Sequence, residues 1–270
     1  MRILFVADVI GSPGRKVAKG LLPLVRKEAR ANAVVLNGEN GAAGFGITPE
    51  VAAEFFSMGV DVITTGNHVW DKREILPLLD SEPRLLRPHN YPPGNPGRGV
   101  VTTTVGTTRL AVLNLQGRVF MPPIDDPFRA ADDLISTLRG TVDAIVVDFH
   151  AEATSEKQAL GRYLDGRVAA VVGTHTHVQT ADDRILPGGT AFITDLGLTG
   201  SLGGVIGMKT EMSLHRQIMQ TRGERMQPAD TELYLQGVVV EVEPSTGLAR
   251  SIERLSVPYA RALQGAFKRL

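Results

Sequence analysis

VAAVVGTHTH, residues 168–177, is the most informative stretch of this chain of 270 residues. Its first five residues are apolar and predict a buried β-strand, and the small residues after them predict a tight turn. His175 and His177 stand two residues apart at the end of that strand. Imidazole is a common ligand of Zn, Fe, Ni and Cu, so the pair could reach two neighbouring metal ions. Spacing alone is explained equally well by a turn with two solvated histidines.

The same pattern recurs along the chain, because four other apolar runs end in Asp, Glu, Asn or His side chains. The runs cover residues 2–7, 33–36, 60–63 and 143–147, and the polar residues that follow them are Asp8, Glu39 with Asn40, Asn67 with His68, and His150. In open α/β sheets, sites form beyond the carboxyl ends of the strands. We therefore expect these distant side chains to meet at one edge of a sheet.

Helical patterns alternate with the strands in the first half of the chain. Residues 11–14 (GSPG) predict a turn, residues 15–30 a helix, and Thr48-Pro49 the cap of a second helix that ends near Met58. This order predicts parallel βαβ units.

The middle of the chain predicts a hairpin followed by further βα units, and the last third is largely β. The hairpin strands are residues 100–105 and 109–115; helices are expected at 128–138, 155–164 and 211–220, and late strands at 233–243 and 250–257. An α/β fold with two sheets and helices outside them fits this order. We expect a single domain over residues 1–270, since no linker or repeat divides the chain.

Composition excludes several classes of protein. Lys+Arg and Asp+Glu both number 29, which argues against a surface for long nucleic acid or for an anionic membrane. There is no cysteine, so any metal must be bound by N and O ligands. The first apolar run is too short for a signal peptide, and no run approaches the ~18 apolar residues of a membrane span. The cytoplasm is the expected location. The sequence does not fix the oligomeric state, and a homo-oligomer stays open.

Two anionic and five neutral side chains form the candidate ligand set: Asp8, Glu39, Asn40, Asn67, His150, His175 and His177. These are too many groups for one tetrahedral zinc, and they suit two metal ions with open positions. Glu39 could bridge two ions held ~3.5–4 Å apart, as in two-metal hydrolases. Such a centre stays positively charged and would attract a phosphate ester.

His68 cannot easily bind the same ion as Asn67, because the two residues are adjacent. It could instead protonate the oxygen of a leaving group near neutral pH. Its other interpretation is a histidine that only orients Asn67. Asp71 is expected to cap the following helix rather than contact a histidine, and His89 to be a solvated loop residue.

The motif order resembles that of calcineurin-like metallophosphoesterases, which is D-x-H, G-D, G-N-H, H and G-H-x-H. This chain reads Asp8-Val9-Ile10, Gly38-Glu39, Gly66-Asn67-His68, His150 and Gly173-Thr174-His175-Thr176-His177. Three details differ: Ile10 stands in place of a ligand histidine, Glu39 in place of the bridging Asp, and the last motif has a Thr after its glycine. With VADVIG at 6–11, NGEN at 37–40 and GNHVWD at 66–71, these variations resemble the YmdB-like branch.

That resemblance implies a four-layer αββα sandwich of two mixed sheets and a catalytic centre with two metal ions per chain. Asn40 would replace the missing histidine, so that one ion is bound by Asp8, Glu39, Asn40 and His177 and the other by Glu39, Asn67, His150 and His175. Fe and/or Mn are the implied metals, although an N/O ligand set also admits Zn.

The implied activity is that of a phosphodiesterase acting on small phosphodiesters, cyclic nucleotides and 2′,3′-cyclic ones included. A metal-bridging hydroxide would attack phosphorus, and His68 would protonate the departing sugar oxygen. Two other functions stay open: a metal-containing nucleotide-binding regulator with little turnover, and a hydrolase of amides.

Overall fold

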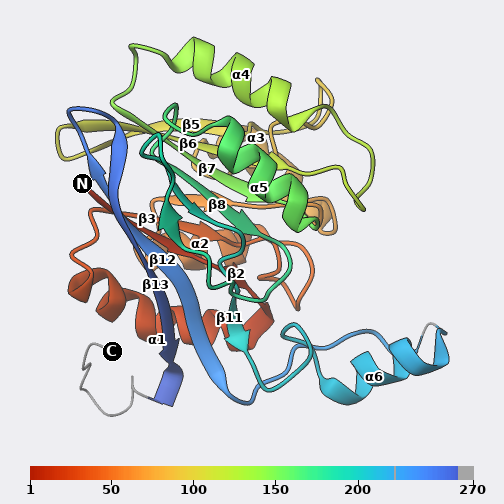
Figure 1. Cartoon of the computed structure of the whole chain (residues 1–270). Coiled ribbons are helices and arrows are strands. Elements are labelled where there is room, and N and C mark those ends of the chain that lie inside the picture. The colour runs from red at the N-terminus through yellow and green to blue at the C-terminus, as the bar shows by residue number, and fades with distance from the viewer. Residues whose placement is uncertain (222, 261–270) are drawn as a thin grey trace.

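Two β-sheets face each other in the middle of the molecule (Figure 1). The computed structural model describes residues 1–221 and 223–260; residues 261–270, which the sequence analysis places in the same domain, lie outside this range. Within it, the first sheet has seven strands: β2 (Asp8–Val9), β11 (Leu198–Ser201), β12 (Leu233–Glu243), β1 (Arg2–Val6), β3 (Ala33–Asn37) and β4 (Val62–Thr64) in spatial order, with β13 (Leu248–Pro258) paired to β12. The second has six: β5 (Val100–Val105), β6 (Thr108–Gln116), β7 (Ala144–His150), β8 (Ala170–Thr174), β10 (Ala191–Ile193) and β9 (Arg184–Ile185).

Three hydrophobic clusters separate the layers. Side chains of α1 (Gly11–Glu28), α2 (Pro49–Ser57) and α3 (Leu76–Ser81) pack on the outer face of the first sheet. Side chains of α4 (Pro127–Leu138) and α5 (Thr154–Tyr163) pack on the outer face of the second. The third cluster lies between the sheets, where residues of β1 and β3 meet residues of β6, β7 and β8. The layer order is therefore α, β, β, α, which confirms the predicted sandwich.

Parallel pairing brings the carboxyl ends of the strands to one edge. β1, β3 and β4 are mutually parallel, and so are β6, β7 and β8. The register pairs Gln116 with His150, and His150 with Thr174. The polar residues at these strand ends consequently lie at the same level of the fold, as the sequence predicts.

Helix α1 begins earlier than expected. The predicted turn at residues 11–14 is wrong, since the helix already starts at Gly11. A Cβ on Gly14 would lie 2.9 Å from Val9 Cγ1 and would collide with the carbonyl oxygen of Thr199. Gly14 thus allows α1 to pack closely on β11, and this packing overrides its turn preference.

Helix α2 begins as predicted: the Thr48 side chain accepts a hydrogen bond from the N–H of Val51, and Pro49 is the first helical residue. A short 3₁₀ helix, η1 (Arg73–Ile75), precedes α3.

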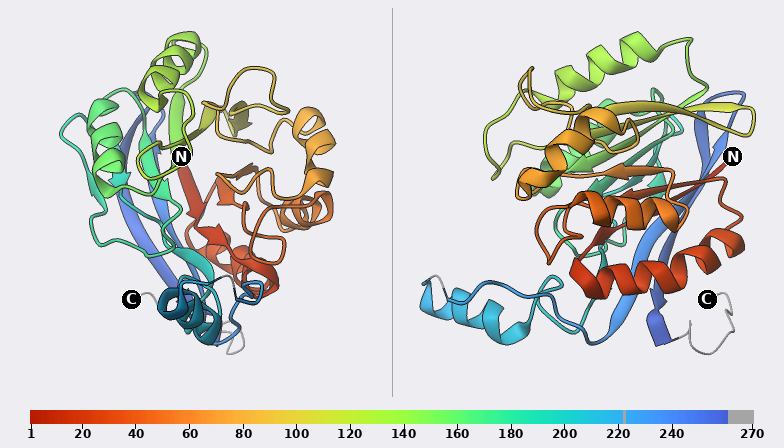
Figure 2. Two further views of the ribbon diagram at one scale, coloured as in Figure 1. Left: turned by 90° about the vertical axis from the view of Figure 1, so that its right-hand side faces the viewer. Right: turned by 180° about the vertical axis from the view of Figure 1, so that it is seen from behind.

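Helix α6 (Thr210–Met219) projects from the body of the molecule (Figures 1 and 2). Ser213 is its one buried residue. None of the helices in the described part of the chain has both the length and the apolar character that a bilayer span requires.

Candidate metal centre

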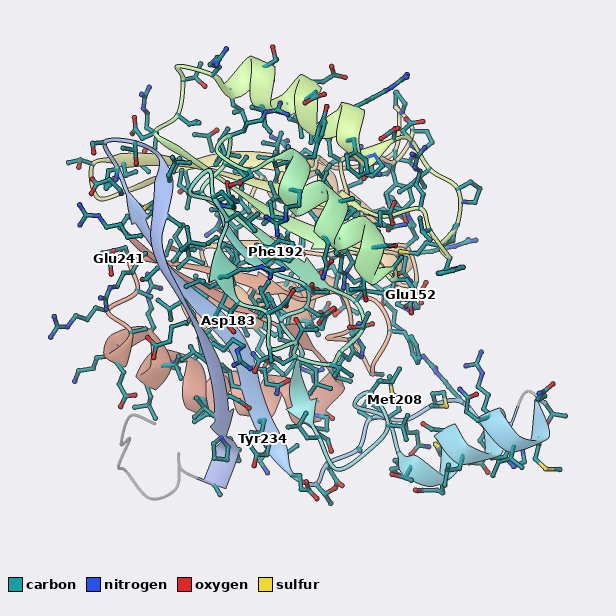
Figure 3. The ribbon with its side chains drawn as sticks, viewed as in Figure 1. Glu152, Asp183, Phe192, Met208, Tyr234 and Glu241 are labelled. Carbon is teal, nitrogen blue, oxygen red and sulfur yellow. The ribbon has the colours of Figure 1, made fainter. Side chains whose placement is uncertain are left out.

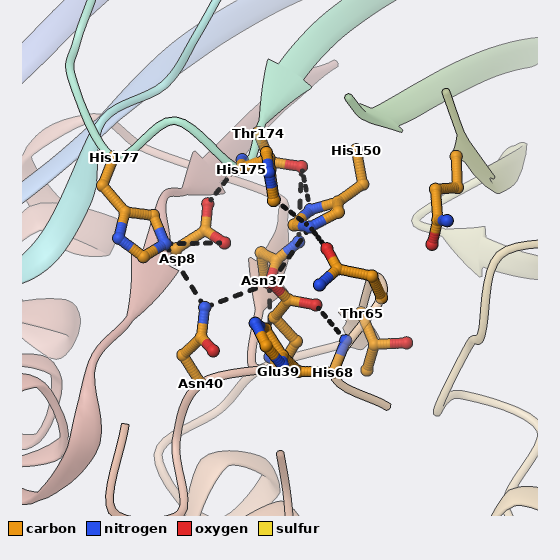
Figure 4. A network of polar contacts seen from close by, with 12 residues as sticks. Asp8, Asn37, Glu39, Asn40, Thr65, His68, His150, Thr174, His175 and His177 are labelled. Carbon is orange, nitrogen blue, oxygen red and sulfur yellow. Dashed lines mark hydrogen bonds and ion pairs between the residues drawn. The ribbon is translucent and has the colours of Figure 1, made fainter. Parts of the chain in front are cut away.

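All seven predicted ligands meet at the carboxyl edge of the sheets. Figure 4 shows Asp8, Glu39, Asn40, His150, His175 and His177 there, and Asn67 Oδ1 lies 3.0 Å from His150 Nε2. They come from the start of β2, the turn after β3, the segment after β4, the last residue of β7 and the turn after β8: Asp8, Glu39 with Asn40, Asn67, His150, and His175 with His177. Four of them are almost fully buried, namely Asp8, Glu39, Asn40 and His150. The convergence predicted from the strand ends is therefore confirmed.

His150 Nε2 is the focus of the first half of this centre. It lies 3.0 Å from Glu39 Oε1, 3.0 Å from Asn67 Oδ1 and 3.0 Å from His175 Nδ1. Glu39, His150 and His175 offer ligand atoms that all lie within 4.8 Å of one another, a spacing that can hold a metal ion. We call Glu39, Asn67, His150 and His175 the glutamate side.

Asp8, Asn40 and His177 form the other half, which we call the aspartate side. His177 Nε2 lies 3.7 Å from Asp8 Oδ1 and 3.3 Å from Asn40 Nδ2. The same amide nitrogen donates to Glu39 Oε1 over 3.1 Å, so Glu39 contacts both sides. Among the described residues, Asp8 Oδ1 and Asn40 Oδ1 are buried oxygens without a hydrogen-bond partner. Buried unpaired oxygens are costly unless a cation or donor satisfies them, so this donor set fits a metal ion.

A second ring of contacts orients the imidazoles. His150 Nδ1 donates to Thr174 Oγ1 over 2.9 Å, and that hydroxyl donates to Asp148 Oδ1 over 2.7 Å. His175 Nε2 lies 3.0 Å from Glu152 Oε2. His177 Nδ1 donates to the carbonyl oxygen of Ile206 over 3.0 Å. Because the outer nitrogen of each ring has a partner, the inner nitrogen faces the centre and can bind metal once it carries no proton.

His68 lies beside the cluster, and its ring is partly exposed. Its backbone N–H donates to Glu39 Oε2 over 3.2 Å, which ties it to the centre. Its Nδ1 lies 2.9 Å from Asp71 Oδ2, and its ring packs edge-on against Phe45 with centroids 5.1 Å apart. The expectation that Asp71 caps a helix is wrong: η1 starts after Lys72 without a side-chain cap, and Asp71 contacts the histidine instead.

The turn that carries the two histidines is strained. His175 has φ of 103° and His177 of 63°, a region that residues with a Cβ rarely adopt. Asp195 stabilises the turn by hydrogen bonding: its Oδ2 accepts from the N–H of Thr176 over 3.1 Å and from Lys157 Nζ over 2.6 Å. Lys157 and Asp195 are both buried, so the ion pair is well shielded from water.

On the aspartate side, the opposite charges of Asp8 and His177 shift the pKa values of both groups. Burial alone would raise the pKa of Asp8, but the His177 imidazole and its neighbouring histidines lower that pKa to about 2. Burial alone would lower the pKa of His177, but Asp8 raises it to about 9. On the glutamate side, burial and the charge of His150 lower the pKa of His175 to about 3, so this imidazole is neutral near pH 7. Burial raises the pKa of Asp148 to about 6.

Sequence reasoning missed three supporting residues: Glu152, Lys157 and Asp195. Glu152 stands two residues after His150, so the strand-end pattern that identified the predicted ligands could have identified it as well. Lys157 lies on helix α5 and gives no such signal. His89, expected to be solvated, is half-buried, and burial lowers its pKa.

Comparisons with known proteins point to one family. Residues 4–255 match the sequence profile of the YmdB-like protein family. A 2′,3′-cyclic-nucleotide 2′-phosphodiesterase from Bacillus subtilis is 48% identical over 257 residues, which cover 95% of this chain and 97% of the relative. The crystal structure of a phosphatase from Mycoplasma pneumoniae superposes with a TM-score of 0.89 at 33% identity, covering 98% of this chain and 96% of that one.

A more distant structure shows the same fold. It is a calcineurin-like phosphoesterase from Bacillus subtilis, with a TM-score of 0.61 and 12% identity over 100% of this chain and 92% of the other. A profile match over nearly the whole chain and a relative at 48% identity lead to one conclusion. This chain belongs to the YmdB-like family.

Proposed function

We propose that this protein is a metal-dependent phosphodiesterase that hydrolyses small phosphodiesters, 2′,3′-cyclic nucleotides above all. The observation that carries the proposal is the meeting of Glu39, Asn67 and His175 around His150 Nε2, with His68 beside them. The name and the 48% identity of the Bacillus subtilis relative support the choice of substrate class.

Two metal ions per chain are part of the proposal. The glutamate side would hold one and the aspartate side the other, with Glu39 shared between them. Fe and/or Mn suit the imidazole, carboxylate and amide donors, and Zn suits them as well. When bound, such ions polarise phosphoryl oxygens and lower the pKa of water.

The charge of the centre favours an anionic substrate. Asp8 and Glu39 are its two carboxylates, and their charge does not offset that of two divalent ions. A phosphodiester monoanion is therefore attracted, and charge that develops on it in the transition state is stabilised. A neutral amide gains less, so amide hydrolysis is the weaker candidate.

In this proposal His68 protonates the departing sugar oxygen. Asp71 contacts Nδ1, which leaves Nε2 as the ring nitrogen that can donate to a substrate. For a 2′,3′-cyclic nucleotide the oxygen of water forms a new bond to phosphorus, the bond between phosphorus and the 2′ oxygen breaks, and the Nε2 proton of the His68 imidazolium completes the 2′ hydroxyl. The product is a nucleoside 3′-phosphate.

Hydrolysis of 2′,3′-cyclic AMP and of bis-p-nitrophenyl phosphate by the wild-type protein and by His68→Ala tests this function. An alkoxide needs a proton to leave, whereas p-nitrophenolate does not. We expect kcat on the cyclic nucleotide to fall ~10²–10⁴-fold and kcat on the aryl ester to fall much less. Metal content, measured by elemental analysis, should stay at the wild-type value.

Three results would contradict the proposal. Loss of metal in His68→Ala would make His68 a ligand. Equal losses on both substrates would remove its role as proton donor. Tight binding of the cyclic nucleotide by wild-type protein without product would favour a nucleotide-binding regulator.

A further inference from the structure

Phe120 is the most exposed of the large apolar side chains in the described part of the chain, at 88%. It lies in the loop between β6 and α4. Isolated exposed apolar residues are common on protein surfaces. Phe120 also has φ of 61°, however, which is unfavourable for a residue with a Cβ. Strain of this kind gathers at ligand-binding sites.

Buried groups fix this loop in place. The Glu156 carboxylate on α5 accepts from the N–H of Arg118 over 3.0 Å and from the N–H of Val119 over 3.2 Å. Glu156 is only 7% exposed, and these are the two residues that precede Phe120. The conformation that exposes the phenyl ring is therefore held by charge-assisted hydrogen bonds.

The anchor of the loop touches the metal centre. The N–H of Gly117 donates to the carbonyl oxygen of His150 over 3.0 Å. A Cβ on Gly117 would lie 2.6 Å from Ala151 Cβ and would collide with the Glu156 carboxylate, so this position needs glycine. Loop and metal ligand are thus parts of one rigid unit.

The loop that carries Phe120 starts beside the metal centre. Gln116 pairs with His150 in the parallel register, and Phe120 follows four residues later, at most ~14 Å along the chain. In the common view of Figures 1 and 3, this loop and Glu152, which follows β7, lie on the same right-hand side of the molecule. In a 2′,3′-cyclic nucleotide the base is joined to the ribose carbon next to the reacting phosphate ester, so a phosphate at the centre brings the base to the residues that border it, this loop among them.

We propose that Phe120 is a stacking surface for the nucleobase of the substrate, an inference that depends on the proposed function. The phenyl face suits any base, because every base has a π-face. Selectivity for a particular base is not expected. The site instead separates nucleotides from phosphodiesters that carry no base.

The test compares 2′,3′-cyclic AMP with ribose 2′,3′-cyclic phosphate, which has the same reacting group and no base. In Phe120→Ala we expect kcat/KM for cyclic AMP to fall ~5- to 100-fold, mainly through KM, relative to kcat/KM for the base-free substrate. Phe120→Trp should restore the ratio. Val119→Ala, a change in the neighbouring exposed side chain, is the matched control and should keep the wild-type ratio.

An unchanged ratio in Phe120→Ala would overturn the inference. So would a change of oligomeric state in sedimentation without a change of ratio, since the ring would then belong to an interface between copies. The base-free substrate also reports the proposed function separately. If the wild-type protein hydrolyses neither compound, the dissociation constant of cyclic AMP decides: a weaker constant in Phe120→Ala supports stacking, and an equal one overturns it.

Discussion

The two sides of the metal centre differ in how completely the protein prepares them. On the glutamate side, three ligand atoms lie 3.0 Å from a single nitrogen, His150 Nε2. On the aspartate side the contacts of His177 Nε2 are longer, 3.3 and 3.7 Å, and two buried oxygens lack partners. The first side therefore has its ligands in place, whereas the second must adjust before it can bind.

Asn40 shows what that adjustment is. Its amide nitrogen, not its oxygen, faces Glu39 and His177. A ligand amide binds metal through oxygen, so Asn40 has to present its Oδ1 atom to an ion bound on this side. The two ions should therefore bind with unequal affinity, and the glutamate side should bind its ion first.

Replacement of Glu39, the residue shared by the two sides, should abolish metal binding on both of them. In Glu39→Ala we expect metal content to fall below one ion per chain and activity to lose several kcal/mol of transition-state stabilisation. Elemental analysis and the hydrolysis of bis-p-nitrophenyl phosphate measure the two effects. Glu50→Ala on α2 removes an exposed carboxylate and should behave as wild type. Two ions retained in Glu39→Ala would show that Glu39 does not join the sides.

Loss of the contact between Glu152 and His175 should weaken metal binding on the glutamate side alone. Glu152→Gln keeps the size of the side chain but loses the charge next to His175 Nε2. We expect the first ion to bind ~10- to 100-fold more weakly, as seen by titration of metal-free protein, while the second is little affected. The control is Glu211→Gln on the projecting helix α6. Equal weakening of both ions, or of neither, would contradict the division into sides.

Protons should compete on the aspartate side. A raised pKa of about 9 keeps His177 protonated in the metal-free protein at neutral pH, and metal must displace that proton. Affinity for the second ion should therefore increase about tenfold per pH unit from pH 7 and level off near pH 9. Calorimetry in buffers of different ionisation enthalpy should show about one proton released at pH 7. His177→Ala should abolish this release, and its persistence would assign the proton to another group.

The same shift makes the metal-free fold depend on pH. Because the folded pKa of His177 lies above its unfolded value of 6.5, the stabilisation is complete below pH 6.5 and is lost as pH rises through about 9. The lowered pKa of Asp8 acts in the opposite sense. Its contribution is present above pH 3.8 and is lost as pH falls towards about 2.

Much of the centre could be predicted because its ligands obey a local rule. A polar residue at the end of a buried strand is visible in the sequence, and parallel pairing then brings such residues together, as with His150 and Glu39. Two sheets with helices outside them fitted the order of strands and helices, and the resemblance to the YmdB-like branch implied the four layers. The contacts that orient the ligands could not be predicted, because they join residues without a local pattern. Lys157 on α5 meets Asp195, which follows β10, and the carbonyl oxygen of Ile206 reaches His177 from a loop.

Local patterns also failed where packing overrides preference. The neighbours of Gly14 predict a turn, yet Gly14 lies in helix α1. Only glycine fits at this position, because a Cβ would collide with the carbonyl oxygen of Thr199. His175 and His177 adopt positive φ although neither residue favours it. In both cases the deciding contact comes from a segment distant in the sequence.

The strained turn limits how this centre could be moved to another protein. A designer who grafted Thr174-His175-Thr176-His177 onto a different sheet would obtain an ordinary relaxed loop, because the strain is held by Asp195 and its buried lysine. The smallest segment set that would keep this turn in its conformation therefore comprises α5, β8 and the residues after β10, and these have to be transferred together with their packing.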